Sequence, residues 1–154
     1  MSEPPAITRI GLLGLGTVGS AFHELVSTRA DAVATASGIR PEISGVLRRS
    51  SGDFEEILAG SDLIVELIGG IDPARDYVLA ALRAGKPVVT ANKQLVAQCG
   101  DELFEAARAN GVQIRYEAAV AGAVPVIRVV QEGHGVLPPL NQVEEGELKS
   151  LKLL

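Results

Sequence analysis

Apolar residues along the chain follow two different spacings, and these two spacings alternate from the amino terminus onward. Short aliphatic stretches have the length of strands, and the nearly continuous apolarity of Leu63–Ile68 is typical of a strand buried on both faces. Residues 112–116 alternate apolar with polar residues, as a half-buried strand does. We therefore predict strands over residues 8–13, 42–47, 63–68, 87–90 and 112–116.

The segments between these stretches predict helices. One face of a first helix is expected to carry Val18, Phe22, Leu25 and Val26. Residues 27–41 are expected to hold the end of that helix and a loop closed by Pro41. Cap signals, such as Asp72–Pro73 before one segment and Gly85 after it, predict further helices. These cover residues 53–60, 72–85, 93–110 with an interruption near Gly100 and a new cap at Asp101, and 125–130. Strands that alternate with helices predict an α/β fold with a doubly wound parallel sheet.

Composition narrows the class of protein. The chain has 154 residues, 47% of them hydrophobic and 21% charged, which fits one ordered domain. A net charge of -5 argues against nucleic-acid binding, and no apolar run reaches the roughly 18 residues of a membrane span. Because Cys99 is the only cysteine, no disulfide within the chain is expected. We predict a cytoplasmic protein whose partners are small molecules or proteins.

A glycine motif after the first predicted strand carries the clearest chemistry. Residues 14–19 read G-L-G-T-V-G, in which the three glycines would serve a sharp turn, the approach of backbone to a pyrophosphate, and close helix–strand packing. A plain strand-to-helix turn is the alternative, but the position between a strand and an amphipathic helix favours a Rossmann-type dinucleotide site. The residues expected to bind, mainly through backbone groups, are Gly14, Leu15, Gly16, Thr17, Val18 and Gly19.

The end of the second predicted strand bears on which cofactor is bound. NAD-binding domains usually carry an acidic residue there, whereas this chain has Arg48, Arg49 and Ser50. Guanidinium and hydroxyl groups suit a 2′-phosphate, so these residues favour NADP. A solvated loop explains them as well, and both NADP and NAD stay open.

Further motifs appear in a fixed order along the chain. They are Val65–Gly70 (V-E-L-I-G-G), Thr90–Lys93 (T-A-N-K) and Tyr116–Gly122 (Y-E-A-A-V-A-G). Together with the glycine motif, they resemble the nucleotide-binding domain of homoserine dehydrogenase from about Ile7 to Glu132. The resemblance implies NAD(P)-dependent interconversion of L-homoserine and L-aspartate 4-semialdehyde, in threonine and methionine biosynthesis.

The resemblance also implies roles for single residues. It places Lys93 beside the nicotinamide and the substrate, both as the catalytic residue and as one of the cofactor-binding residues, and Gly69 and Gly70 beside the nicotinamide ribose. A surface lysine and a plain turn are the alternatives. It further implies a site for a monovalent cation, expected to be sodium, at Glu117, Val120, Gly122 and Val124.

The chain departs from the family pattern after residue 133. The catalytic and dimerisation domain of the family, with its N-G-T-T-N-Y motif, finds no counterpart in residues 134–154. We therefore expect an NAD(P)-binding domain over residues 1–133, an irregular tail over 134–154, and a truncated product or fragment. Cofactor binding follows from the resemblance, whereas turnover by this chain alone and a homo-oligomeric state do not.

Two other functions are compatible with parts of the sequence. A non-catalytic NAD(P)-binding module, acting as a sensor or partner-binding domain, would need the glycine motif but not the catalytic domain. Another small-substrate dehydrogenase, such as an aspartate dehydrogenase or a dihydrodipicolinate reductase, would share the start of the chain. The T-A-N-K and E-A-A-V-A-G motifs disfavour this last alternative.

Overall fold

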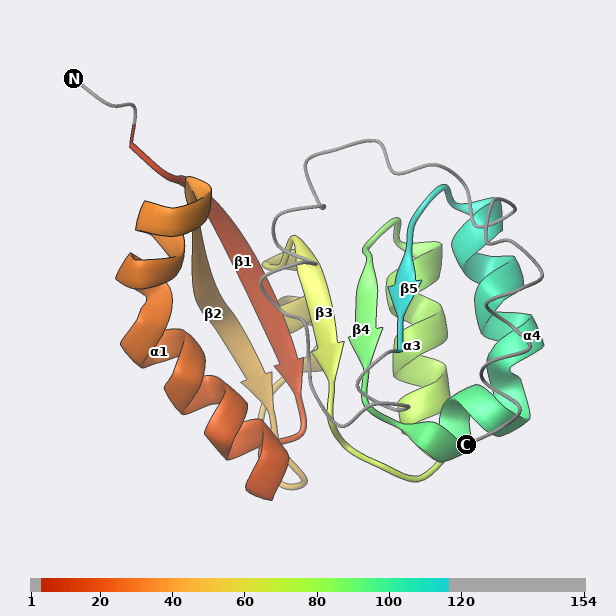
Figure 1. Ribbon diagram of the computed structural model, residues 1–154. Coiled ribbons are helices and arrows are strands. Elements are labelled where there is room, and N and C mark those ends of the chain that lie inside the picture. Colours follow the sequence, from red (N-terminus) through yellow and green to blue (C-terminus); the bar gives the residue numbers. More distant parts are fainter. Residues whose placement is uncertain (1–3, 117–154) are drawn as a thin grey trace, which may run out of the picture.

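A computed structural model describes residues 4–116, which form a five-stranded sheet with all neighbouring strands parallel (Figure 1). The strands are β1 (Ala6–Leu13), β2 (Ile39–Leu47), β3 (Leu63–Glu66), β4 (Val88–Thr90) and β5 (Ile114–Arg115). The helices are α1 (Thr17–Ser37), α2 (Phe54–Ala59), α3 (Ala74–Arg83) and α4 (Lys93–Ala109). The strand order β2-β1-β3-β4-β5 confirms the predicted doubly wound α/β fold.

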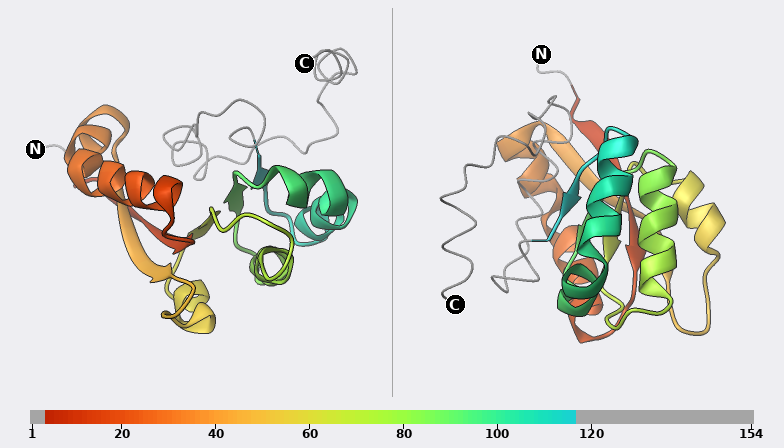
Figure 2. Two further views of the ribbon diagram at one scale, coloured as in Figure 1. Left: turned by 90° about the horizontal axis from the view of Figure 1, so that it is seen from below. Right: turned by 90° about the vertical axis from the view of Figure 1, so that its right-hand side faces the viewer.

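Helices lie on both faces of the sheet, and each face has its own apolar core (Figure 2). Ile10 and Leu12 of β1 face α1, where they join Phe22 and Val26. Neighbouring Leu13 faces the opposite core, which α2, α3 and α4 supply. This alternation follows from the two-residue period of a strand.

The first helix is longer than its pattern predicts. Residues 27–37 continue α1 instead of forming a loop, and the helix ends at Gly38, whose φ of 74° suits a glycine. Ser and Thr side chains in this half donate hydrogen bonds to carbonyls four residues earlier, as Ser27 does to His23. Their polar groups are therefore satisfied within the helix, and the alanines between them favour it.

The predicted buried face of α1 was only partly correct. Phe22 and Val26 are buried, but Val18 and Leu25 are 56% and 54% exposed. Gly19, Phe22, Val26 and Ala30 form the buried stripe instead. Gly19 lets α1 approach the Gly14 carbonyl closely, so the buried stripe runs through Gly19 and leaves Leu25 outside it.

β2 begins before the proline that was expected to close a loop. Pro41 lies inside the strand, opposite Thr8 of β1. In the described part of the chain β2 is an edge strand, where the missing N–H of a proline costs no sheet hydrogen bond.

The other helices begin and end near the predicted positions, with two corrections. Pro73 precedes α3 as its N-cap without a side-chain cap bond, so Asp72 is not the cap. α4 runs without interruption through Gly100, and Asp101 lies inside it rather than at a new cap. A Cβ at residue 100 would lie 3.3 Å from the Phe104 ring, so this glycine allows the ring to pack.

Several predicted features lie outside the described residues: the helix over 125–130, the domain boundary at residue 133 and the tail over 134–154. Within residues 4–116, no helix combines the length and the apolarity that crossing a membrane requires.

Candidate functional site

The strands end along one edge of the sheet, which we call the carboxyl edge, and the predicted site residues lie on segments that leave the strands there (Figure 1). β1 and β3 are neighbours at its centre, whereas β2 lies on the other side of β1. The chain therefore leaves β1 toward β2 and later returns to β3 across β1. Open α/β sheets bind ligands at such a reversal of strand order.

Gly14 makes the turn at the end of β1 with a φ of 99°, which favours glycine. A Cβ atom at this position would lie 2.7 Å from the carbonyl oxygen of Leu67 in the segment after β3. The Gly14 amide donates a 2.9 Å hydrogen bond to the carbonyl oxygen of Leu47 at the end of β2. Gly14 thus brings the ends of β1, β2 and β3 close together.

The other two glycines of the motif have opposite surroundings. A Cβ at Gly16 would meet no atom of the described residues within 4 Å. A Cβ at Gly19, which is buried in α1, would overlap the carbonyl oxygen of Gly14. Packing therefore requires the third glycine, while the second leaves space beside the backbone. These are the roles expected of the glycines in a pyrophosphate-binding turn.

The amino terminus of α1 can receive an anion. Gly16 is the N-cap, no side chain caps the helix, and its first turn contains no acidic residue. The amides of Gly16, Thr17 and Val18 donate to no acceptor within residues 4–116. Free amides and the positive end of the helix dipole together favour a phosphate group.

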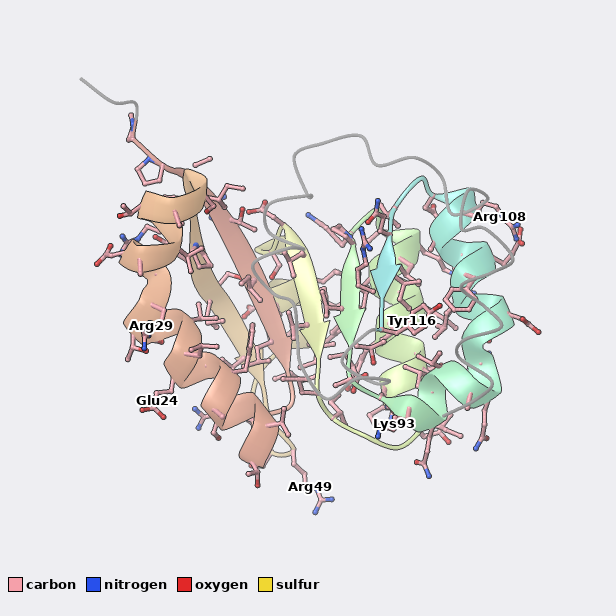
Figure 3. All side chains as sticks on the ribbon, viewed as in Figure 1. Glu24, Arg29, Arg49, Lys93, Arg108 and Tyr116 are labelled. Atoms are coloured by element: carbon pink, nitrogen blue, oxygen red, sulfur yellow. The ribbon has the colours of Figure 1, made fainter. Side chains whose placement is uncertain are left out.

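Basic residues follow β2 at the same edge. Arg48 and Ser51 pair through their backbones, so residues 48–51 form a tight turn, and Arg48, Arg49 and Ser50 are exposed. Figure 3 shows Arg49 pointing away from the sheet at the carboxyl edge. Neither arginine has an ion-pair partner in the part of the chain that is described. Both guanidinium groups are therefore available to an anionic ligand.

Lys93 is the first residue of α4 and lies at the carboxyl edge (Figure 3). Its side chain is exposed and makes no hydrogen bond or ion pair to another described residue. The preceding residue, Asn92, caps the helix by accepting a 3.1 Å hydrogen bond from the Leu95 amide. No acidic residue lies in the first turn of α4. Lys93 therefore adds its charge to the positive end of a helix dipole.

Three buried polar residues at this edge were not selected from the sequence. Glu66, Thr90 and Asn92 are at most 5% exposed and are joined by hydrogen bonds that also reach the Gly69–Gly70 loop. The available signal was the single acidic residue within the apolar run Leu63–Ile68. This run supports a strand and, through Val65–Gly70, the family resemblance, but neither of these predictions gave Glu66 itself a role.

The predicted cation site lies outside the described residues, because Glu117, Val120, Gly122 and Val124 all follow residue 116. Among the described residues, no group of three or more His, Cys, Asp or Glu side chains could hold a metal ion.

Comparison with known proteins identifies a family to which the chain is similar. The family described as homoserine dehydrogenase, NAD binding domain, matches residues 14–117. Homoserine dehydrogenase from Corynebacterium glutamicum is 42% identical over 139 residues, which cover 80% of this chain and 31% of that protein. For the enzyme from Pseudomonas aeruginosa the identity is 37% over 139 residues, covering 81% and 32%.

A solved structure leads to the same family. The crystal structure of a homoserine dehydrogenase from Thiobacillus denitrificans is 36% identical, with a TM-score of 0.73 over 86% of this chain and 34% of that one. The chain spans about a third of the length of these relatives. The described fold, the glycine turn and these matches together show that the chain belongs to the family of homoserine dehydrogenase NAD-binding domains.

Proposed function

We propose that this chain binds NADP, or alternatively NAD, at the carboxyl edge and supplies the cofactor-binding part of a homoserine dehydrogenase. The reaction would interconvert L-homoserine and L-aspartate 4-semialdehyde, a step toward threonine and methionine. Because the chain spans about a third of its relatives, cofactor binding and turnover are separate parts of this proposal.

The observation that carries the proposal is the contrast between Gly16 and Gly19. Space remains beside Gly16, and the free amides of Gly16, Thr17 and Val18 border it. A diphosphate would accept hydrogen bonds from these amides, with Leu15 contributing backbone alone. The proposed binding of a diphosphate at this turn is therefore supported by the geometry of the turn as well as by the sequence motif.

Arg48, Arg49 and Ser50 support NADP as the preferred cofactor. They follow β2, whose last residue, Leu47, accepts a hydrogen bond from the Gly14 amide. An adenosine ribose near the glycine turn would therefore lie within reach of residues 48–50. A 2′-phosphate would receive charge-assisted hydrogen bonds from the guanidinium groups.

Lys93 is the proposed catalytic residue. When bound, the cofactor would supply or accept a hydride through its nicotinamide ring. The ammonium group of Lys93 would orient the substrate alcohol or polarise the aldehyde oxygen, and Gly69 and Gly70 would border the nicotinamide ribose. A cation at the start of a helix is opposed by the helix dipole by about 0.3–1 kcal/mol, so helix stability does not account for this lysine.

Other parts of the sequence analysis stay predictions. These are the sodium site at Glu117, Val120, Gly122 and Val124, the domain boundary at residue 133 and the cytoplasmic location, while a homo-oligomeric state stays open.

A turnover assay separates the two parts of the proposal. The purified chain is mixed with NADPH and aspartate 4-semialdehyde, and the loss of NADPH absorbance is followed. Lys93→Ala should lower any turnover by about 100-fold or more while weakening NADPH binding much less, because the diphosphate contacts at the glycine turn remain. Lys86→Ala is the control. The Lys86 amine donates a hydrogen bond to the carbonyl oxygen of Ser61, at the edge of the sheet opposite the carboxyl edge.

The outcomes distinguish the candidate functions. Turnover that Lys93→Ala abolishes supports the dehydrogenase. NADPH binding without turnover supports a non-catalytic NAD(P)-binding module, and equal turnover in both variants would refute the role of Lys93.

A further inference from the structure

Glu66 is a carboxylate in an unusual place. It is the last residue of β3, it is completely buried, and its strand neighbours are Leu13 of β1 and Thr90 of β4. A buried carboxylate is costly unless hydrogen-bond donors replace the water it has lost. The donors around Glu66 therefore indicate what its side chain does.

The hydrogen-bond donors to Glu66 among residues 4–116 are all uncharged. Its Oε1 accepts hydrogen bonds from the backbone amides of Ile68 at 2.7 Å and Gly69 at 3.3 Å, and its Oε2 accepts one of 2.5 Å from the Thr90 hydroxyl. Within residues 4–116, Glu66 forms no ion pair. Its carboxylate thus joins the loop that follows β3 to the end of β4.

A second connection holds the same loop from its other side. The Thr90 hydroxyl accepts a 3.0 Å hydrogen bond from the Asn92 amide. The Asn92 side chain donates a 2.5 Å hydrogen bond to the carbonyl oxygen of Gly70 and caps α4. The loop is therefore fixed to the helix terminus that begins with Lys93.

The glycines of this loop have little else to hold them. Gly69 and Gly70 have φ values of 80° and 74°, and Cβ atoms built on them would meet nothing within 4 Å in the described part of the protein. Side-chain packing does not fix this segment. Its conformation depends on the bonds from Glu66 and Asn92, since two consecutive glycines are otherwise free to adopt many conformations.

Stability alone does not explain the carboxylate. The adjoining residues of β3 are apolar, and an apolar residue in place of a buried charge is often neutral or stabilising. A hydrogen-bonded carboxylate instead defines one geometry for the groups that it joins.

We propose that Glu66 is a positioning residue that fixes the Gly69–Gly70 loop relative to Lys93 and thereby sets where the nicotinamide half of a dinucleotide lies. The nature of the ligand rests on the proposed function. The anchoring of the loop rests only on the contacts described above.

Two pairs of variants test the proposal. Thr90→Val removes the hydroxyl that links Glu66 to the Asn92 amide, whereas Thr90→Ser retains it. Glu66→Leu removes both acceptors, whereas Glu66→Gln retains an oxygen for the loop amides. The Thr90 pair keeps the test decisive if Glu66→Leu does not fold.

Each folded variant is subjected to two measurements. Hydrogen exchange of the Ile68 and Gly69 amides reports on the loop without any ligand. Titrations compare NADPH with adenosine 2′,5′-bisphosphate, which lacks the nicotinamide half. Thr90→Val and Glu66→Leu should accelerate exchange and weaken NADPH roughly tenfold, as expected for a lost buried hydrogen bond, with the bisphosphate unaffected. Thr90→Ser and Glu66→Gln should resemble the parent chain.

Two results would overturn the inference. One is unchanged exchange of the loop amides in Thr90→Val or Glu66→Leu. The other is equal weakening of both ligands, which indicates a general structural role. If the parent chain binds neither ligand, the proposed function fails, and the exchange measurement still decides whether Glu66 anchors the loop.

Discussion

The three glycines of the motif over residues 14–19 have different structural roles. Gly14 is needed for a turn in the left-handed region, and Gly19 for contact with the Gly14 carbonyl. Gly16 has an ordinary φ of -74° and open space beside it. Folding therefore requires the first and the third, whereas nothing in the described fold requires the second, which we propose for ligand binding.

Matched alanine variants separate these roles. Gly19→Ala should destabilise the chain by about 1–3 kcal/mol through overlap with the Gly14 carbonyl, lowering Tm by several degrees. Gly16→Ala should leave Tm within about a degree, yet weaken NADPH binding at least tenfold, because its Cβ would occupy the space assigned to the diphosphate. Thermal unfolding and NADPH titration test both. A Gly16→Ala protein that binds NADPH normally would contradict this account.

The arginines after β2 permit a test of cofactor preference. Arg48→Asp should weaken NADPH by about 10- to 100-fold and NADH much less, because only NADPH carries a 2′-phosphate for the guanidinium. Arg29→Asp makes the same charge change on the exposed side of α1, away from the carboxyl edge, and should affect neither (Figure 3). Equal losses for the two cofactors would remove Arg48 from the site.

The roles of some residues can be predicted from the sequence, whereas those of others depend on the fold. The glycine motif is local, so its spacing alone predicted the turn that the structure contains. Glu66 and Thr90 are 24 positions apart, and they meet only because β3 and β4 are neighbours in the sheet. Without the strand order, each is simply the polar end of an apolar run.

At the level of elements, the pattern predicted which elements exist better than where they end. The second half of α1 lacks a strong apolar stripe, and its serines and threonines usually indicate loops. The bonds that keep this half helical form within the helix itself, such as the one from Ser27 to the His23 carbonyl. Similarly, Pro41 is tolerated because β2 is an edge strand, which only the sheet order reveals.

The contact between α3 and α4 supports the helix that carries Lys93. Arg75 of α3 donates hydrogen bonds to both carboxylate oxygens of Glu102 in α4, with closest atoms 2.6 Å apart. The hydrogen bond to Glu102 and its negative charge raise the pKa of Arg75 above the usual value, so the guanidinium stays protonated. The two side chains are 37% and 41% exposed, and solvent therefore weakens the pair.

Removing one charge of this pair should have a small effect. Glu102→Gln should lower the free energy of unfolding only slightly, because solvent screens the pair, and should leave NADPH affinity unchanged. Urea denaturation measures the first and titration the second. Glu24→Gln on α1, where the carboxylate has no ion-pair partner among residues 4–116, is the control and should unfold like the parent chain. Equal stability of the two variants would show that the pair contributes nothing measurable.

Across the whole molecule, strand order explains why motifs that are distant in the sequence lie at the same edge of the sheet. Each of four segments follows a different strand: the glycine turn, the turn over residues 48–51, the Gly69–Gly70 loop and the start of α4 at Lys93. Because neighbouring strands are parallel, all four lie at the carboxyl edge. Alternating strands and helices were enough to predict this architecture. The resemblance to homoserine dehydrogenase was needed to single out Lys93, because an exposed lysine at a helix start has no distinctive pattern.

The central claim is that amides at the start of α1 bind the diphosphate of a nicotinamide cofactor. Titration of the isotope-labelled chain with NADPH, followed by the backbone amide signals in NMR spectra, tests this claim directly. The account predicts saturable shifts that are largest for Gly16, Thr17 and Val18, with the amides at the opposite edge of the sheet unmoved. Signals that stay in place at millimolar NADPH, or that shift only away from this turn, would contradict it.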